Sequence, residues 1–478
     1  MKAATVLVNI RNFFKTSAQA LVSSFEVDSR AIVCCRIWFG ILLTLDWFDH
    51  YRHANYFYGP RSIFGGSPGY QIVKGAIPFT LFDAVHASPA GTLLWGLILL
   101  SFIAFTLGYK TRLSAFFSYI GFVSLGWQRW PTVAGFDILM ALLLFFYIFL
   151  PEHRPNDERK LRSFPIFLIY IQVCLVYWVG FFAKMTGYHW REGSAIYYSM
   201  EILNFSYPWV ADLSRALPFW ILKSMTWLTL LLEFLIPFFL LISRVRLLGV
   251  GLLFVLHLQI FVLLNLHYFS PVMWGFSLLF LPAAVYDRIR FPLDLKVSNF
   301  TESRWDCWLR SAVLLIFLGV SGFSLKYHIT HEPPKNWLEN RLFELMVVSW
   351  NIQNWFMYAP NPGDFLSWVV TEAKYSDGKV IDIDTKKIPQ FDSAPEGLEK
   401  MPYKWRKFTF WLPNNYYFIA EGLRDYYWDK GLELISNGNS LTGLRVWVCT
   451  AKIPPMEERL KPGVRPLTAS SYLITQWN

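Results

Sequence analysis

The feature that most constrains this chain is a series of nine apolar segments, most of them separated by short polar loops. Each is close to the length of about 17–25 residues with which a helix crosses a bilayer. A soluble core does not explain nine such runs at this spacing, so the sequence predicts a mainly helical, polytopic membrane bundle of about nine spans. The segments are 31–48, 90–108, 113–130, 134–150, 164–183, 225–242, 247–265, 270–285 and 309–325.

The composition agrees with a lipid bilayer as the main partner. Charged residues make up 16% of the chain, whereas soluble domains carry about 25%, which excludes disorder and argues against a soluble enzyme. Aromatic residues reach 19%, and Trp and Tyr collect at membrane–water interfaces. The net charge of +10 comes without a basic block interleaved with aromatics, so no nucleic acid is expected.

The loops predict an orientation. With the N-terminus in the cytoplasm, the inside segments hold twice as many Lys and Arg as the outside loops, as the positive-inside rule requires. Residues 1–30 are expected to form an amphipathic segment on the cytoplasmic surface. An odd number of spans then places residues 326–478 outside. We expect a multi-pass protein of a cell inner membrane, or of the ER membrane in a eukaryote.

Residues 326–478 read as a small extracytoplasmic α+β domain, following the membrane domain at 31–325. Two β-type runs flank Asp377-Gly378, a hairpin signal. Leu444–Val448 is another strand candidate, and residues 413–431 have helical spacing.

Ionisable side chains at membrane depth are costly, so each is a candidate for function. Two interpretations stay open for them: they pair with one another and set the packing of the bundle, or they take part in chemistry. These residues are Arg36, Asp46, Asp137, Glu233 and His257.

Lys184 at the end of the fifth segment is the most informative of the polar residues. It follows Phe181 and precedes Trp190. One interpretation is a helix-end Lys that extends to the interface. The other is a desolvated Lys whose charged form is disfavoured, so that it acts as a general base. His50 and His53 have a spacing that suits a metal, but no third ligand is evident, so no metal is expected.

The residues around Lys184 resemble the catalytic-lysine region of the vitamin K-dependent γ-carboxylases. Trp190, Glu192-Gly193 and Tyr198–Glu201 follow the Lys as they do in that family, with one extra residue before the Trp. Glu233, His257 and the run Phe269-Ser270-x-Val272-Met273 have the family's spacing.

Further segments extend the resemblance to the wider group of HTTM membrane proteins. Arg36-Ile37-x-Phe39-Gly40 is similar to the start of that domain, and residues 353–362 are similar to its Q-x-W-x-M-F-x-P-x-P element. Tyr375–Gly378 and Lys404-Trp405-Arg406 have counterparts in the carboxylase tail.

The resemblance implies a carbon–carbon lyase or carboxylase. In that family the Lys deprotonates a reduced naphthoquinone (vitamin K or menaquinol), O2 adds, and the strong base that forms removes a γ-proton from a protein glutamate, which CO2 then captures. A dry pocket is needed, because water would quench that base. The substrate here would be an exported peptide or protein.

The resemblance also assigns residues. Lys184 and His257 would be catalytic. The family's His before the fourth span is absent from residues 128–137, which leaves Arg129 as the candidate for its charge. The residues expected around the cofactor are Trp190, Glu233, Arg129 and Phe181.

A second function stays open on the sequence. The chain would then be a non-enzymatic maturation or folding factor, with its C-terminal part binding a secreted client. A transporter would require broken helices and usually repeats, and neither is clear in the sequence.

Overall fold

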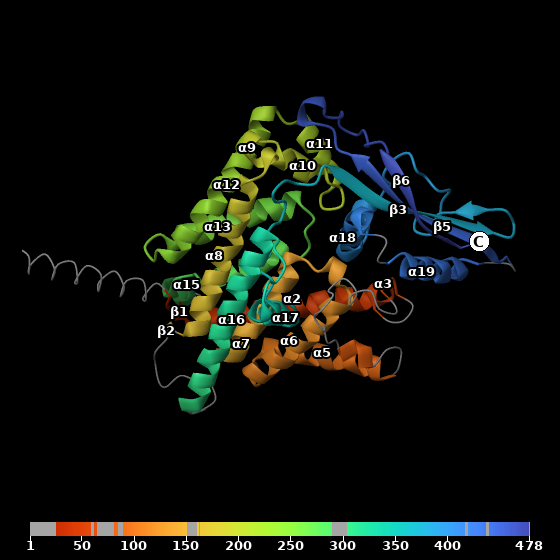
Figure 1. Cartoon of the computed structure of the whole chain (residues 1–478). Coiled ribbons are helices and arrows are strands. Elements are labelled where there is room, and N and C mark those ends of the chain that lie inside the picture. The colour runs from red at the N-terminus through yellow and green to blue at the C-terminus, as the bar shows by residue number, and fades with distance from the viewer. Residues whose placement is uncertain are drawn as a thin grey trace, which may run out of the picture.

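The structure is a computed structural model. It describes residues 25–58, 62–64, 81–84, 89–150, 160–161, 163–288, 304–415, 419–435 and 439–477. Most of the predicted amphipathic segment, residues 1–24, lies outside this part of the chain. Figure 1 shows a helical bundle on one side and a small antiparallel sheet on the other, with one short helix, α18, between them.

The bundle is built from helices that follow the predicted apolar runs closely. Its longer helices are α2 (Ser29–Arg52), α5 (Pro89–Leu107), α6 (Thr111–Gln128), α7 (Gly135–Phe149), α8 (Phe164–Met185), α12 (Phe219–Leu241), α13 (Arg246–Leu263) and α16 (Arg304–Thr330). Shorter helices complete it: α3 (Ala54–Phe57), α9 (Tyr188–Glu192), α10 (Ala195–Glu201), α11 (Pro208–Ala216), α14 (Phe269–Leu278), α15 (Ala283–Arg288) and α17 (Trp337–Val348).

Five helices in the described part of the chain are long and apolar enough to cross a membrane, so the fold is compatible with an integral membrane protein. The predicted number of nine spans is not confirmed. The eighth run, 270–285, is divided into α14, of 10 residues, and α15. Pro282 lies in the break, and a proline lacks the N–H that a continuous helix would need there.

Large apolar side chains cover the outside of the bundle, as lipid contact requires. Soluble proteins rarely expose contiguous apolar surface on this scale. The exposed residues include Leu93, Leu97, Leu100 and Leu107 on α5, Trp220, Trp227 and Leu231 on α12, and Leu247, Phe254, Val255 and Phe261 on α13.

The C-terminal part contains a four-stranded antiparallel sheet in the order β4-β3-β5-β6. The strands are β3 (Phe365–Tyr375), β4 (Val380–Ile381), β5 (Leu441–Lys452) and β6 (Ser470–Trp477). The predicted hairpin is confirmed, because β3 and β4 pair across a turn in which Gly378 has a φ of 83°. The strand predicted at Leu444–Val448 lies within β5. A separate two-stranded pair joins β1 (Val27–Asp28) to β2 (Lys160–Leu161).

Two helices of the C-terminal part are α18 (Tyr403–Trp411) and α19 (Ala420–Glu433). The helix predicted over 413–431 corresponds to α19 but begins later. The sequence 412–414 instead forms a short 3-10 turn that contains Pro413.

Both faces of the sheet are covered, which explains why β3 is buried over most of its length. Leu366, Trp368 and Val370 pack with residues of α10 and α11 in one core cluster. Val369 and Ala373 belong to the main core, which includes α18 and α19. The segment between α8 and α12 and the C-terminal part are therefore one packed unit.

Candidate functional site

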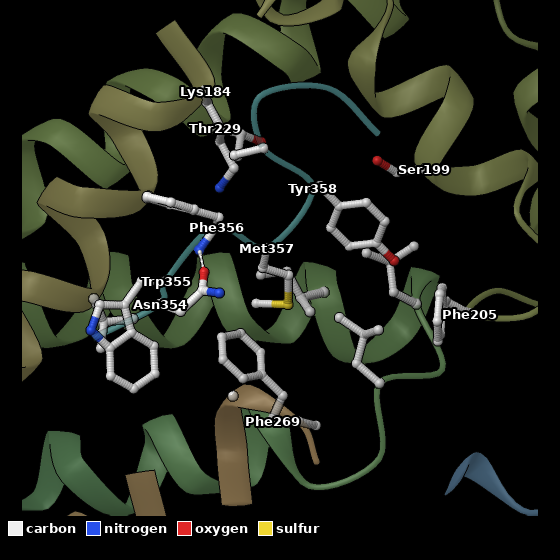
Figure 2. Close-up of a pocket in the computed structure, with 18 of the residues that line it drawn as sticks. Lys184, Ser199, Phe205, Thr229, Phe269, Asn354, Trp355, Phe356, Met357 and Tyr358 are labelled. Atoms are coloured by element: carbon white, nitrogen blue, oxygen red, sulfur yellow. Dashed lines mark hydrogen bonds between the residues drawn. The ribbon is translucent and has the colours of Figure 1, made fainter. Parts of the chain in front are cut away.

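A cavity of about 540 Å³ lies between the bundle and the C-terminal part. Most of its wall is aliphatic and aromatic, with a few polar side chains among them (Figure 2). A volume of this size suits a small-molecule site. The polar side chains of the wall are Lys184, Glu233, His257, Tyr177, Ser199, Thr229, Gln259, His328, Asn354, Asn361, Tyr358, Tyr403 and Lys407.

Lys184 reaches this cavity from the last turn of α8. Its side chain is buried, and its Nζ donates a hydrogen bond to Oε1 of Glu233 on α12. The Nζ also lies 4.9 Å from the centre of the Trp190 ring. Figure 2 shows the amine directed into the pocket beside Phe356. The prediction that Lys184 is desolvated among aromatic side chains therefore agrees with its position.

Glu233 contributes a free acceptor to the same place. Its Oε2 is buried and has no hydrogen-bond partner among the described residues. Gly180 faces the pair, and a Cβ at that position would lie 3.8 Å from both this oxygen and Nζ of Lys184. The glycine therefore keeps open the space next to the pair.

His257 is the third of these groups and comes from α13. Its Nε2 lies 2.9 Å from the hydroxyl of Tyr177, a residue of α8 that sequence reasoning did not single out. Its Nδ1 is buried and has no partner among the described residues. The ring therefore has one fixed nitrogen and one that is available.

The segment 350–361 forms one wall of the cavity. Gln353 pairs with Gln172 of α8 through two hydrogen bonds of 2.9 and 3.0 Å. Further along, the carbonyl oxygen of Tyr358 accepts a bond of 2.8 Å from the Trp190 indole. The sequence identified this segment by its resemblance to an HTTM element but not as part of a site.

Lys407, on α18, is the main site residue that the sequence analysis missed. It lines the cavity, and its Nζ donates to the carbonyl oxygen of Val133. Burial, together with the neighbouring Lys404 ammonium, lowers the pKa of Lys407 to about 7. No pattern in the sequence marks Lys407. It follows Lys404-Trp405-Arg406, in a segment far along the chain from the helices of the bundle.

Arg129 and Phe181 do not line the cavity. Arg129 is buried beside it, where it bonds to Asp137 at 3.0 Å and to the Tyr58 hydroxyl at 2.9 Å. Phe181 packs against the Phe182 and Phe234 rings. Nη1 of Arg129 is buried and has no hydrogen-bond partner among the described residues, and the expected role of Arg129 at a cofactor stays a prediction.

Asp137 is the centre of a buried ionic cluster that joins the bundle to α18. Besides Arg129, it accepts two bonds from Nζ of Lys404, at 2.6 and 2.8 Å. Its second oxygen also accepts from the backbone N–H of Ala134. These contacts agree with the first interpretation of Asp137, in which the residue pairs with other charges inside the fold.

The cavity thus combines a largely apolar wall with the paired Lys184 and Glu233. Within the described residues, no group of three His, Cys, Asp or Glu side chains could hold a metal ion. Comparison of the chain with protein-family models, with curated proteins and with solved structures found no match.

Proposed function

We propose that this protein is a membrane enzyme that couples the oxidation of a reduced naphthoquinone to the carboxylation of glutamate in an exported peptide or protein. The overall reaction consumes the hydroquinone, O2, CO2 and a glutamate γ-C–H bond. It yields the quinone epoxide, water and γ-carboxyglutamate. The observation that carries the proposal is the Lys184–Glu233 pair, buried at the wall of a largely apolar cavity.

The first task of such an enzyme is to take a proton from a hydroquinone hydroxyl. A phenolic hydroxyl ionises with a pKa of about 10 in water, so the site must supply a base and stabilise the anion. Lys184 is the amine at the cavity wall that is placed to take this proton, and Glu233 holds it by a hydrogen bond.

Lys184 would hold a hydroquinone hydroxyl at the cavity wall, and its ammonium form would stabilise the charge of the ionised oxygen. Glu233 holds the amine in place, and His257 offers Nδ1 as a further polar contact. The aromatic and aliphatic wall keeps water away from the reactive centre, as carbanion chemistry requires.

The predicted orientation belongs to this proposal, and contacts between distant segments support it. Segments expected on the outside contact the C-terminal part: Phe57 packs on Trp405 and Phe408, Val133 bonds to Lys407, and the His267 ring stacks on Tyr403. The buried segment between α8 and α12 packs on the sheet.

Segments expected on the inside also meet one another. Residues 27–28 pair with residues 160–161, and Arg30 forms a 2.9 Å ion pair with Asp287. This grouping of segments supports the proposed orientation, with the N-terminus in the cytoplasm and the C-terminal part outside.

Replacement of Lys184 tests the proposal. We expect Lys184→Ala to lower hydroquinone-dependent incorporation of labelled bicarbonate into a glutamate peptide by at least the 10²–10⁴-fold that a general base contributes. The double variant Lys184→Met/Glu233→Gln removes the charge left on Glu233 and should fold while staying inactive. Lys223→Met, on α12 but outside the cavity wall, is the matched control.

Activity that survives in both Lys184 variants would overturn the proposal. The alternative, a maturation factor, has its own signature: the purified protein would carry an exported client and no quinone, and the Lys184 variants would still bind that client.

A further inference from the structure

The cavity contains a second amine, and its surroundings differ from those of Lys184. Three cations lie on α18: Lys404, Arg406 and Lys407. Lys404 is paired with Asp137, and Arg406 donates to the backbone carbonyls of Met401, Asn204 and Asn265. Lys407 is the one of the three that lines the cavity.

Lys407 has no carboxylate partner among the described residues. Its one hydrogen bond goes to the neutral carbonyl oxygen of Val133. The carboxylate that acts on it, Asp137, is already engaged, because its two oxygens accept bonds from Arg129, from Lys404 and from the backbone of Ala134. An unpaired ammonium in a largely apolar cavity is unfavourable unless an anion joins it.

The charges around Lys407 favour such an anion. The groups that act on it are Lys404, Arg129 and Asp137, so the cations there outnumber the carboxylate. None of these groups belongs to the Lys184–Glu233 pair. Lys407 is therefore a separate polar centre on the wall that α18 contributes.

A donor is also available near α18. The hydroxyl of Tyr358 is buried and has no hydrogen-bond partner among the described residues. It lies within the electrostatic reach of Tyr403 and Arg406, which places it toward α18. Tyr358 and Lys407 both line the cavity, so an anion bound there has the Tyr358 hydroxyl as a candidate second donor.

We propose that Lys407 binds the side-chain carboxylate of the acidic peptide substrate, with Tyr358 as a second donor. The inference rests on the proposed function for the identity of the peptide. It assigns the two amines of the cavity to different partners: Lys184 to the hydroquinone and Lys407 to the glutamate.

The test compares two peptides that differ only by Glu and Gln at the target position. Their equilibrium binding to the full-length protein in nanodiscs is measured by fluorescence anisotropy, without hydroquinone. We expect the wild type to prefer the Glu peptide by about tenfold or more, the range for hydrogen bonds to charged groups. Lys407→Met should bind both peptides equally, and Lys407→Arg should keep most of the preference.

The controls separate this inference from the proposed function. Lys430→Met on α19 and Lys223→Met on α12, both outside the cavity wall, should keep the preference for the Glu peptide. A preference that depends on Lys407, in a protein that never carboxylates, would leave the inference standing and remove the proposed reaction.

Three results would overturn the inference. One is a wild type that does not distinguish the peptides, and another is a Lys407→Met variant that distinguishes them as well as the wild type does. The third is Lys407-dependent binding of oleate without binding of either peptide, which would assign the amine to a lipid carboxylate.

Discussion

At the scale of single residues, the site is defined by which buried charges have a partner. Lys184 has Glu233, and Asp137 has both Arg129 and Lys404. Lys407 has a backbone carbonyl instead of a carboxylate. Removing a charge from water is costly unless a partner compensates for it, so the contribution of Lys407 to the free energy of unfolding depends on pH.

This dependence has a definite sign. The unfolded chain keeps the Lys407 proton up to a pKa near the ordinary lysine value of 10.5, whereas burial and the Lys404 charge lower the folded pKa to about 7. Between these values the unfolded state binds more protons, so the contribution of Lys407 to stability rises with pH. Below about pH 7 the full penalty of the buried charge is present.

We therefore expect Lys407→Met to raise the melting temperature relative to wild type more at pH 6 than at pH 9.5. The measurement is thermal unfolding in detergent at both values, with Lys430→Met as the exposed control. A difference between variant and wild type that is the same at the two pH values would show that the amine is not held in a desolvated place.

At the scale of elements, close approach of helices depends on small residues. Gly40 of α2 is buried directly against the side chain and backbone of Thr106 on α5, with no room for a Cβ. Small residues let helix backbones approach in this way in membrane proteins, where packing rather than the hydrophobic effect drives association.

We expect Gly40→Ala to destabilise the protein by about 1–3 kcal/mol, the usual range for overpacking. Gly96→Ala on α5 is the control, since an added Cβ there meets no atom within 4 Å and Ala is the better helix former. Thermal or denaturant unfolding in detergent measures both. Equal stability of the two variants would contradict the close packing of α2 and α5.

At the scale of the whole molecule, the cavity exists because the C-terminal part docks on the bundle. α18 contributes Tyr403, Lys407 and Phe410 to the cavity wall. The ionic cluster at Asp137 holds α18 against the start of α7, with all its groups buried. Separation of α18 from the bundle would expose the cavity to water.

Substitutions in this cluster should weaken the contact between α18 and the bundle to different degrees. Asp137→Asn leaves two cations unpaired and should cost more than Lys404→Met, which leaves the Arg129–Asp137 pair intact. Breaking a buried pair costs about 3–5 kcal/mol. Limited proteolysis of the C-terminal part reports the loosening, and Glu433→Gln, which removes the exposed pair with Lys430, is the control.

The reverse order, with Lys404→Met more susceptible than Asp137→Asn, would show that Lys404 acts through something other than its contact with Asp137. Protection equal to wild type in both variants would show that the apolar contacts alone hold the two parts together.

Several parts of this structure could be predicted from the sequence because they depend on local properties. Helices follow the apolar runs, since hydropathy and length act within one segment. The hairpin follows from Asp377-Gly378, because the turn needs a residue that tolerates a positive φ. Lys184, Glu233 and His257 were found as candidates, because a charge in an apolar run is conspicuous wherever it lies.

Only the tertiary structure decided which of these residues meet. Asp137 pairs with Lys404, 267 residues away, and the segment 350–361 forms a cavity wall between helices that precede it in the chain. Lys407 carries no local signal, because its place in the cavity comes from the docking of α18. The sequence shows which charges are costly to bury, but long-range packing decides which partner compensates for each of them.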